Sequence, residues 1–91
     1  MTDRLRIGIA QINPVVGDIR GNVEKVKAAS AKVSDCDLIV FPELVISGYP
    51  PEDLVMKPAF AAYCRAATEA LAKDAAGGPA LLVGTPWPEG G

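Results

Sequence analysis

The chain has 91 residues, of which 49% are hydrophobic and 22% are charged, and its formal net charge is -2. A composition so near the average of soluble globular domains excludes the disordered and fibrous classes. Binding to nucleic acid needs clustered Lys and Arg, and the nine basic residues form no cluster, so nucleic acid is not an expected partner.

Histidine is absent, which excludes Ser-His-Asp and Cys-His nucleophile pairs within these residues. The two cysteines, Cys36 and Cys64, lie too far apart for a zinc spacing, so no metal is expected. No apolar run approaches the ~20 residues that span a bilayer, and the first residues do not resemble a signal peptide. We therefore expect a cytoplasmic chain with no membrane partner and with reduced thiols.

The first half of the sequence predicts a strand followed by a helix. Residues 4–12 read as a strand, because Leu5, Ile7 and Ile9 alternate with smaller or polar neighbours. Residues 20–35 carry apolar side chains near helical spacing, with charged side chains on the other faces. This pattern is typical of a helix that packs on a sheet and exposes one side to water.

Residues 37–42 form a continuous apolar run of strand length, as in a central strand of a parallel sheet that is buried on both faces. A loop with Gly48 follows, and Pro58 stands where a second helix can begin. Over residues 59–76 the apolar residues form a stripe that includes Cys64, which indicates a core residue and not a nucleophile. Residues 80–83 predict a third strand.

The order strand, helix, strand, helix, strand predicts an α/β fold with parallel strands and right-handed crossovers. Parallel sheets are normally covered on both faces, and two helices leave apolar surface of a three-stranded sheet uncovered. Either a partner covers this surface or the residues are the first part of a longer chain.

Glu43 lies just beyond the carboxyl end of the second predicted strand, and this edge is where sites assemble in open α/β sheets. Pro42 stiffens the backbone before it. The apolar neighbours of Glu43 predict that its carboxylate is partly desolvated. Desolvation raises the pKa of a carboxyl group toward that of a useful general base. The alternative is a solvated Glu at a strand end. Tyr49 either presents its hydroxyl to the site or caps the core, and Trp87 either lines a site or covers the sheet.

The stretches IGIAQINPVVGDIRGN, DLIVFPEL, SGYPPEDL and LLVGTPWPE together resemble the nitrilase, or carbon-nitrogen hydrolase, superfamily. GYPPEDL further resembles the amidotransferase domain of the glutamine-dependent NAD synthetases. The resemblance implies an incomplete nitrilase-type α-β-β-α sandwich. Residues 1–91 would be the amino-terminal part of the carbon-nitrogen hydrolase (glutamine amidotransferase) domain, with the synthetase domain absent.

The resemblance also implies a mechanism with a glutamate, a lysine and a cysteine. The cysteine attacks the amide carbon, the glutamate takes and returns protons, and the lysine stabilises the oxyanion. Glu43 matches the catalytic glutamate, and Tyr49 lies in a loop that borders the glutamine pocket in similar proteins. The lysine and the cysteine belong to segments beyond the third strand, so the 91 residues alone are expected to be inactive.

In this family the ammonia travels to a synthetase domain, where ATP adenylates nicotinic acid adenine dinucleotide and the amide of NAD forms. No cofactor is expected in residues 1–91, and ATP and Mg are implied for the synthetase domain. The full-length enzyme is expected to be a homo-oligomer. Two alternatives remain open: a nitrilase-type amidase without a synthetase domain, and a non-catalytic α/β interaction module.

Overall fold

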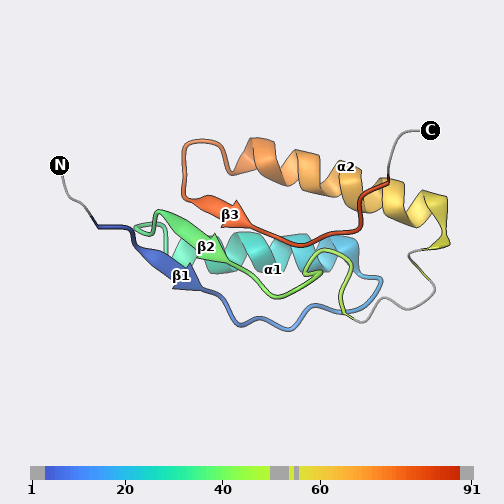
Figure 1. The fold of residues 1–91 in the computed structure, drawn as a ribbon, viewed down its shortest axis with the longest axis horizontal. Helices are drawn as coiled ribbons and strands as arrows, with labels where there is room; N and C mark the ends of the chain where they lie inside the picture. Colours follow the sequence, from blue (N-terminus) through green and yellow to red (C-terminus); the bar gives the residue numbers. More distant parts are fainter. Residues whose placement is uncertain (1–3, 50–53, 55, 89–91) are drawn as a thin grey trace.

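The structure is a computed structural model that describes residues 4–49, 54 and 56–88. Its elements are, in chain order, strand β1 (Ile7–Ile9), helix α1 (Ile19–Lys32), strand β2 (Leu38–Val40), helix α2 (Pro58–Asp74) and strand β3 (Ala80–Leu82) (Figure 1). The strands form one parallel sheet in the order β1-β2-β3. The expected α/β fold is thus confirmed. Residues 50–53 of the GYPPEDL motif lie outside the described residues.

The ends of the helices follow from local sequence signals. The side chain of Asp18 caps α1 by accepting a hydrogen bond of 3.1 Å from the backbone N–H of Gly21. Helix α2 begins at Pro58, where the missing N–H costs no helical hydrogen bond. After α2 the chain reverses at Gly77, which has a φ of 89° that residues with a side chain rarely adopt.

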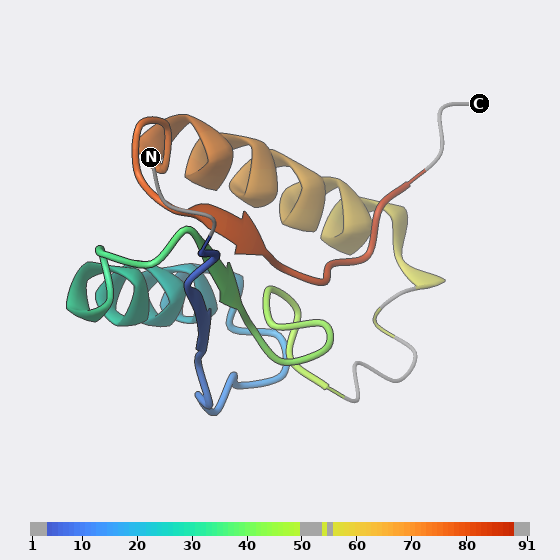
Figure 2. The ribbon, with the colours of Figure 1, turned by 60° about the vertical axis from the view of Figure 1, so that its left-hand side comes forward.

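Helices α1 and α2 pack against each other, as two views of the ribbon show (Figures 1 and 2). An exposed ion pair of 2.9 Å joins Lys27 of α1 to Asp74 of α2. The hydrogen bond to Asp74 and its negative charge raise the pKa of Lys27 above its usual value. Both helices therefore cover the same face of the sheet.

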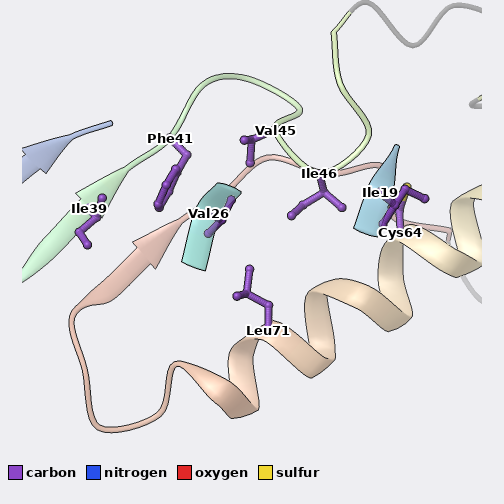
Figure 3. Close-up of a cluster of buried hydrophobic side chains, with 8 residues drawn as sticks. All are labelled: Ile19, Val26, Ile39, Phe41, Val45, Ile46, Cys64 and Leu71. Carbon is purple, nitrogen blue, oxygen red and sulfur yellow. The ribbon is translucent and has the colours of Figure 1, made fainter. Parts of the chain in front are cut away.

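The core lies between this face and the two helices (Figure 3). Its buried hydrophobic cluster combines helix residues with residues of β2 and of the segment after it: Ile19, Val26, Ile39, Phe41, Val45, Ile46, Cys64 and Leu71. Cys64 and Leu71 belong to the predicted apolar stripe of α2, and their burial confirms that prediction.

The other face of the sheet is open. Ile7, Ile9 and Leu82 are 52%, 76% and 57% exposed. On β1 it is Gly8 that faces the helices, because a Cβ there would lie 3.1 Å from the Sγ atom of Cys36. The expectation that β2 is buried on both faces is wrong for these residues, since Leu38 and Val40 are half-buried. The predicted uncovered apolar surface is confirmed.

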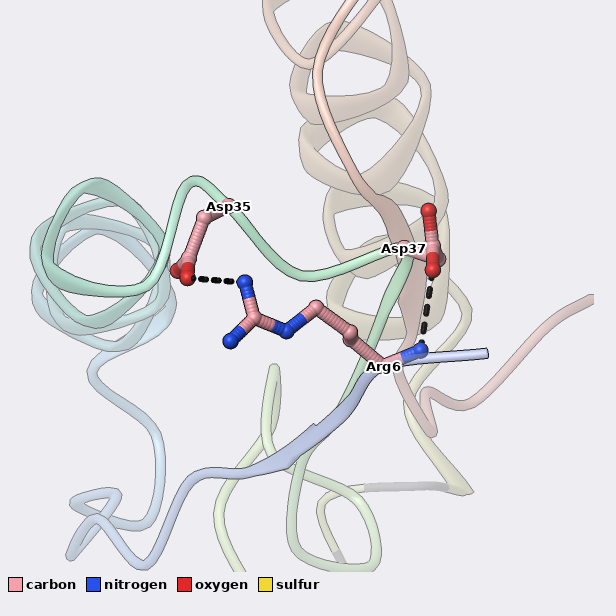
Figure 4. Close-up of polar contacts among 3 residues, drawn as sticks. All are labelled: Arg6, Asp35 and Asp37. Carbon is pink, nitrogen blue, oxygen red and sulfur yellow. Dashed lines mark hydrogen bonds and ion pairs between the residues drawn. The ribbon is translucent and has the colours of Figure 1, made fainter. Parts of the chain in front are cut away.

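Charged residues align the strands at the amino-terminal edge of the sheet (Figure 4). The backbone N–H of Arg6 donates a hydrogen bond of 2.9 Å to Oδ2 of Asp37. The guanidinium of Arg6 donates a second one, of 2.8 Å, to Oδ2 of Asp35. The ion pair is well exposed, so its contribution to stability is small. These two aspartates therefore serve strand pairing, at the edge opposite to Glu43.

Candidate active site

Glu43 is placed by the end of β2. The strand pairing continues past Val40, since the backbone N–H of Phe41 donates to the carbonyl oxygen of Leu82 at 3.1 Å. Pro42 then ends the ladder, and residues 43–47 form a turn. Glu43 thus lies at the carboxyl edge of the parallel sheet, as the sequence predicted.

The expected partial desolvation of Glu43 is wrong for the chain as it stands. Its side chain is exposed, whereas Val45 and Ile46 of the same turn are fully buried. The apolar residues of the turn fill the core under α1 and α2, and the carboxylate is left on the outer side. Apolar neighbours in the sequence therefore did not become apolar neighbours in space.

The turn has a strained backbone next to Glu43. Leu44 has a φ of 50°, a left-handed conformation that costs a residue with a side chain about 1–2 kcal/mol. Such strain persists where the surrounding structure holds it in place, and it is frequent at functional sites. The backbone N–H of Gly48 closes the turn by donating to the carbonyl oxygen of Leu44 at 2.8 Å.

Two glycines allow other segments to approach this turn closely. A Cβ on Gly84, just after β3, would lie 2.7 Å from the backbone N of Leu44. A Cβ on Gly48 would lie 2.5 Å from the Cα of Val16, in the loop between β1 and α1. Segments that follow β1 and β3 therefore enclose the turn that carries Glu43.

Two hollows are lined by sequence neighbours of Glu43. One of about 540 Å³ is lined by the carboxyl ends of β1 and β2, including Phe41 and Pro42. Another of about 490 Å³ is lined by Leu44, Met56, Pro58, Ala61, Pro86, Trp87 and Pro88. Glu43 itself lines neither of these two hollows.

Trp87 lines the second hollow. The guanidinium of Arg65 in α2 lies 4.6 Å from the centre of the indole ring, within the range of a cation–π contact. Arg65 also donates a 3.4 Å hydrogen bond to the carbonyl oxygen of Pro88. Trp87 is therefore held against α2 and lines this hollow. That it lines a site stays a prediction.

Tyr49 follows the same turn and is 60% exposed, which excludes the alternative that its ring caps the core of this chain. Among the described residues, no hydrogen bond links Tyr49 to Glu43. The structure thus places both predicted site residues in one loop, with both side chains exposed and no hydrogen bond between them.

Cys64 does not have the environment of a nucleophile. Burial raises the pKa of its thiol, and a hydrogen bond with Thr85 offsets only part of that effect. The thiolate is the reactive form, so a raised pKa makes Cys64 inert near neutral pH. The prediction that Cys64 is a core residue is confirmed.

The raised pKa of Cys64 predicts a pH dependence of stability. Below the ordinary thiol pKa of 9.0 the thiol is protonated in both the folded and the unfolded chain. Above it the unfolded chain loses the proton first, so the free energy of unfolding falls as pH rises. Chemical denaturation at pH 8 and pH 10 should show a smaller fall for Cys64→Ala than for the wild type. Equal falls would contradict the assignment.

The described residues include no group of three or more His, Cys, Asp or Glu that could hold a metal ion. In the same part of the chain, no helix is long and apolar enough to cross a membrane.

Residues 6–86 match the carbon-nitrogen hydrolase family, and the chain belongs to this family. It is 46% identical over 89 residues to the glutamine-dependent NAD(+) synthetase of Rhodobacter capsulatus and 41% identical over 92 residues to that of Xylella fastidiosa. These alignments cover 96% and 98% of this chain, but the chain spans only 16% of the length of each relative. The resemblance identified from the motifs is therefore confirmed.

Solved structures show the same fold. A glutamine-dependent NAD+ synthetase from Acinetobacter baumannii, in complex with ADP, matches with a TM-score of 0.74 and 32% identity, over 89% of this chain and 15% of that one. An amidase from Nesterenkonia sp. matches with a TM-score of 0.76 and 27% identity, over 94% of this chain and 34% of that one. The three strands and two helices thus match part of the fold of these proteins.

Proposed function

We propose that these residues are the amino-terminal part of the glutamine amidotransferase domain of a glutamine-dependent NAD synthetase, with Glu43 as the general base. The observation that carries this proposal is the similarity of nearly the whole chain to proteins of that name. The position of Glu43 at the carboxyl edge of the sheet supports its role, because sites in open α/β sheets assemble there.

Glutamine hydrolysis then requires one proton carrier and one nucleophile. Glu43 takes the proton from a cysteine thiol, the thiolate attacks the amide carbon of glutamine, and Glu43 returns the proton to the departing ammonia. Water then gives a proton to Glu43 and attacks the thioester carbon, glutamate is released, and the cysteine thiolate takes the proton from Glu43. Cys64 is buried and does not serve as this nucleophile. The cysteine and the oxyanion-stabilising lysine would come from residues outside this chain.

Tyr49 is proposed to border the glutamine pocket. It follows the turn that carries Glu43, and its ring is 60% exposed and free to contact a ligand or a covering segment. The Tyr hydroxyl can donate or accept one hydrogen bond, which suits an amide or a carboxylate group of the substrate.

The remaining chemistry belongs to a separate synthetase domain in this proposal. There ATP activates nicotinic acid adenine dinucleotide by adenylation, and ammonia forms the amide of NAD. The described residues do not fit a Mg site, because they offer no cluster of metal ligands. A cytoplasmic, homo-oligomeric enzyme is part of the same proposal.

The isolated 91-residue chain is expected to release no ammonia from glutamine. A general base without its nucleophile cannot form the thioester intermediate. Ammonia release by the purified chain should equal that of its Glu43→Ala variant, and a rate above this control would contradict the proposal.

The full-length protein tests the function directly. Incubated with glutamine, ATP and nicotinic acid adenine dinucleotide, it should release ammonia and form NAD. The similarity to the fold of an amidase supports a second candidate function, that of a nitrilase-type amidase without a synthetase domain. Ammonia release without NAD formation would select that candidate. An intact mass in the cell near 9.5 kDa would instead favour a non-catalytic interaction module.

A further inference from the structure

The side chain of Asn22 is fully buried in the first turn of α1, although it is polar. Its Oδ1 atom accepts a hydrogen bond of 2.7 Å from the backbone N–H of Val15. Its Nδ2 atom donates to the carbonyl oxygens of Val15 and Ile46, both at 2.9 Å. Both protons of the amide and its oxygen are thus used, and all three partners are backbone groups.

These hydrogen bonds join two loops that are far apart in the sequence. Val15 belongs to the loop between β1 and α1, and Ile46 belongs to the turn that carries Glu43. A further hydrogen bond of 2.9 Å, from the backbone N–H of Gly17 to the carbonyl oxygen of Ser47, runs between the same two loops. Asn22 is the side chain at this junction, and it fixes the turn relative to α1.

The strained residue of the turn lies between Glu43 and the anchored part. Leu44 has a φ of 50°, and a strained conformation persists only when its surroundings over-determine it. Gly84 restrains the turn from the β3 side, where its carbonyl oxygen accepts from the N–H of Ile46 at 3.4 Å. Asn22 restrains it from the α1 side. Loss of one restraint allows Leu44 to relax, and the adjacent Glu43 then moves.

We propose that Asn22 is a positioning residue for Glu43, and this inference rests on the proposed role of Glu43 as the general base. Asn22 faces the backbone and does not touch the reacting atoms. Its effect on catalysis is exerted through the placement of the carboxylate, because a displacement of about 1 Å can cost roughly 100-fold in rate.

The test is a double-mutant cycle in the full-length protein, with ammonia release from glutamine as the assay. Asn22→Ala should lower kcat by about 10- to 100-fold with a much smaller change in KM. In a Glu43→Gln background the same substitution should have almost no further effect on kcat, since the group that it positions is gone. Assays are run well below the Tm of each variant, so that all the protein is folded.

Two further variants complete the design. Ser30→Ala removes a half-buried side chain of α1 that donates only to Val26 in its own helix, and it should leave kcat unchanged. Asn22→Ser leaves a hydroxyl for only one of these backbone groups and places no charge against the two carbonyl oxygens, so it serves if Asn22→Ala does not fold. It should also lower kcat.

An unchanged kcat in the folded Asn22 variants would overturn the inference. It would also be overturned if the double variant lost kcat by the product of the two single losses, those of Asn22→Ala and Glu43→Gln. In both cases the proposed function would stand, because Glu43→Gln alone would still be slow. If Glu43→Gln hydrolyses glutamine at the wild-type rate, the role of Glu43 fails, and the inference about Asn22 fails with it.

Discussion

Glu43→Gln in the full-length protein is expected to lower the rate of glutamine hydrolysis by about 100- to 10,000-fold, the usual contribution of a positioned general base. The amide keeps the size of the side chain but cannot accept a proton from the cysteine thiol. Both thiol deprotonation and protonation of the leaving ammonia are then lost. The stability of the fold should change little, because the carboxylate is exposed.

The control for this substitution is Glu24→Gln, which changes an exposed glutamate on α1 away from the turn. It should retain the wild-type rate. NAD formation by the Glu43→Gln variant should be restored by added ammonia, since ammonia enters after the glutaminase step. A Glu43→Gln variant that hydrolyses glutamine within a few-fold of the wild type would contradict the assignment of the base.

The isolated 91-residue chain is expected to self-associate through the open face of its sheet. Ile7, Ile9 and Leu82 expose apolar surface there, and contiguous apolar patches of this kind associate in water. Changing all three to Thr keeps side chains that suit a strand and removes much of the apolar area. At roughly 1 kcal/mol for each side chain, the dissociation constant should rise by about 100-fold.

Sedimentation over a range of concentrations measures this association. The matched control is Tyr63→Thr, which removes a 55% exposed aromatic residue of α2, a helix that covers the other face of the sheet, and should leave the dissociation constant unchanged. A wild-type chain that is a monodisperse monomer with a cooperative melt at all concentrations would contradict the expectation.

The helices could be predicted from the helical spacing of their apolar residues, β1 from alternation, and β2 and β3 from short continuous apolar runs. The orientation of the first strand is a different problem. Alternation shows that Ile7 and Ile9 share one face, but it does not show which face the helices cover. The helices cover the face on which Gly8 lies, where the absence of a side chain permits close packing on the loop after α1. The larger residues remain on the face that the 91 residues leave open.

The candidate site was predictable only in part. The strand end and Pro42 predicted the place of Glu43 correctly, but the left-handed conformation of Leu44 has no signal in the residue type. Asn22 was missed because polar helix residues are usually solvated. A signal was present, since Asn22 lies four residues before buried Val26 and three after buried Ile19, on the same helix face. A polar residue on an apolar stripe indicates a buried hydrogen-bonding group.

The most direct test of the proposed function follows the amide nitrogen itself. The full-length protein is incubated with glutamine labelled with ¹⁵N in the amide group, together with ATP and nicotinic acid adenine dinucleotide, and the product is analysed by mass spectrometry. We expect ¹⁵N in the carboxamide of NAD for the wild type and its loss for Glu43→Gln. Wild-type protein that forms no labelled NAD would contradict the proposed function, and a Glu43→Gln variant that forms it at an unchanged rate would contradict the role of Glu43.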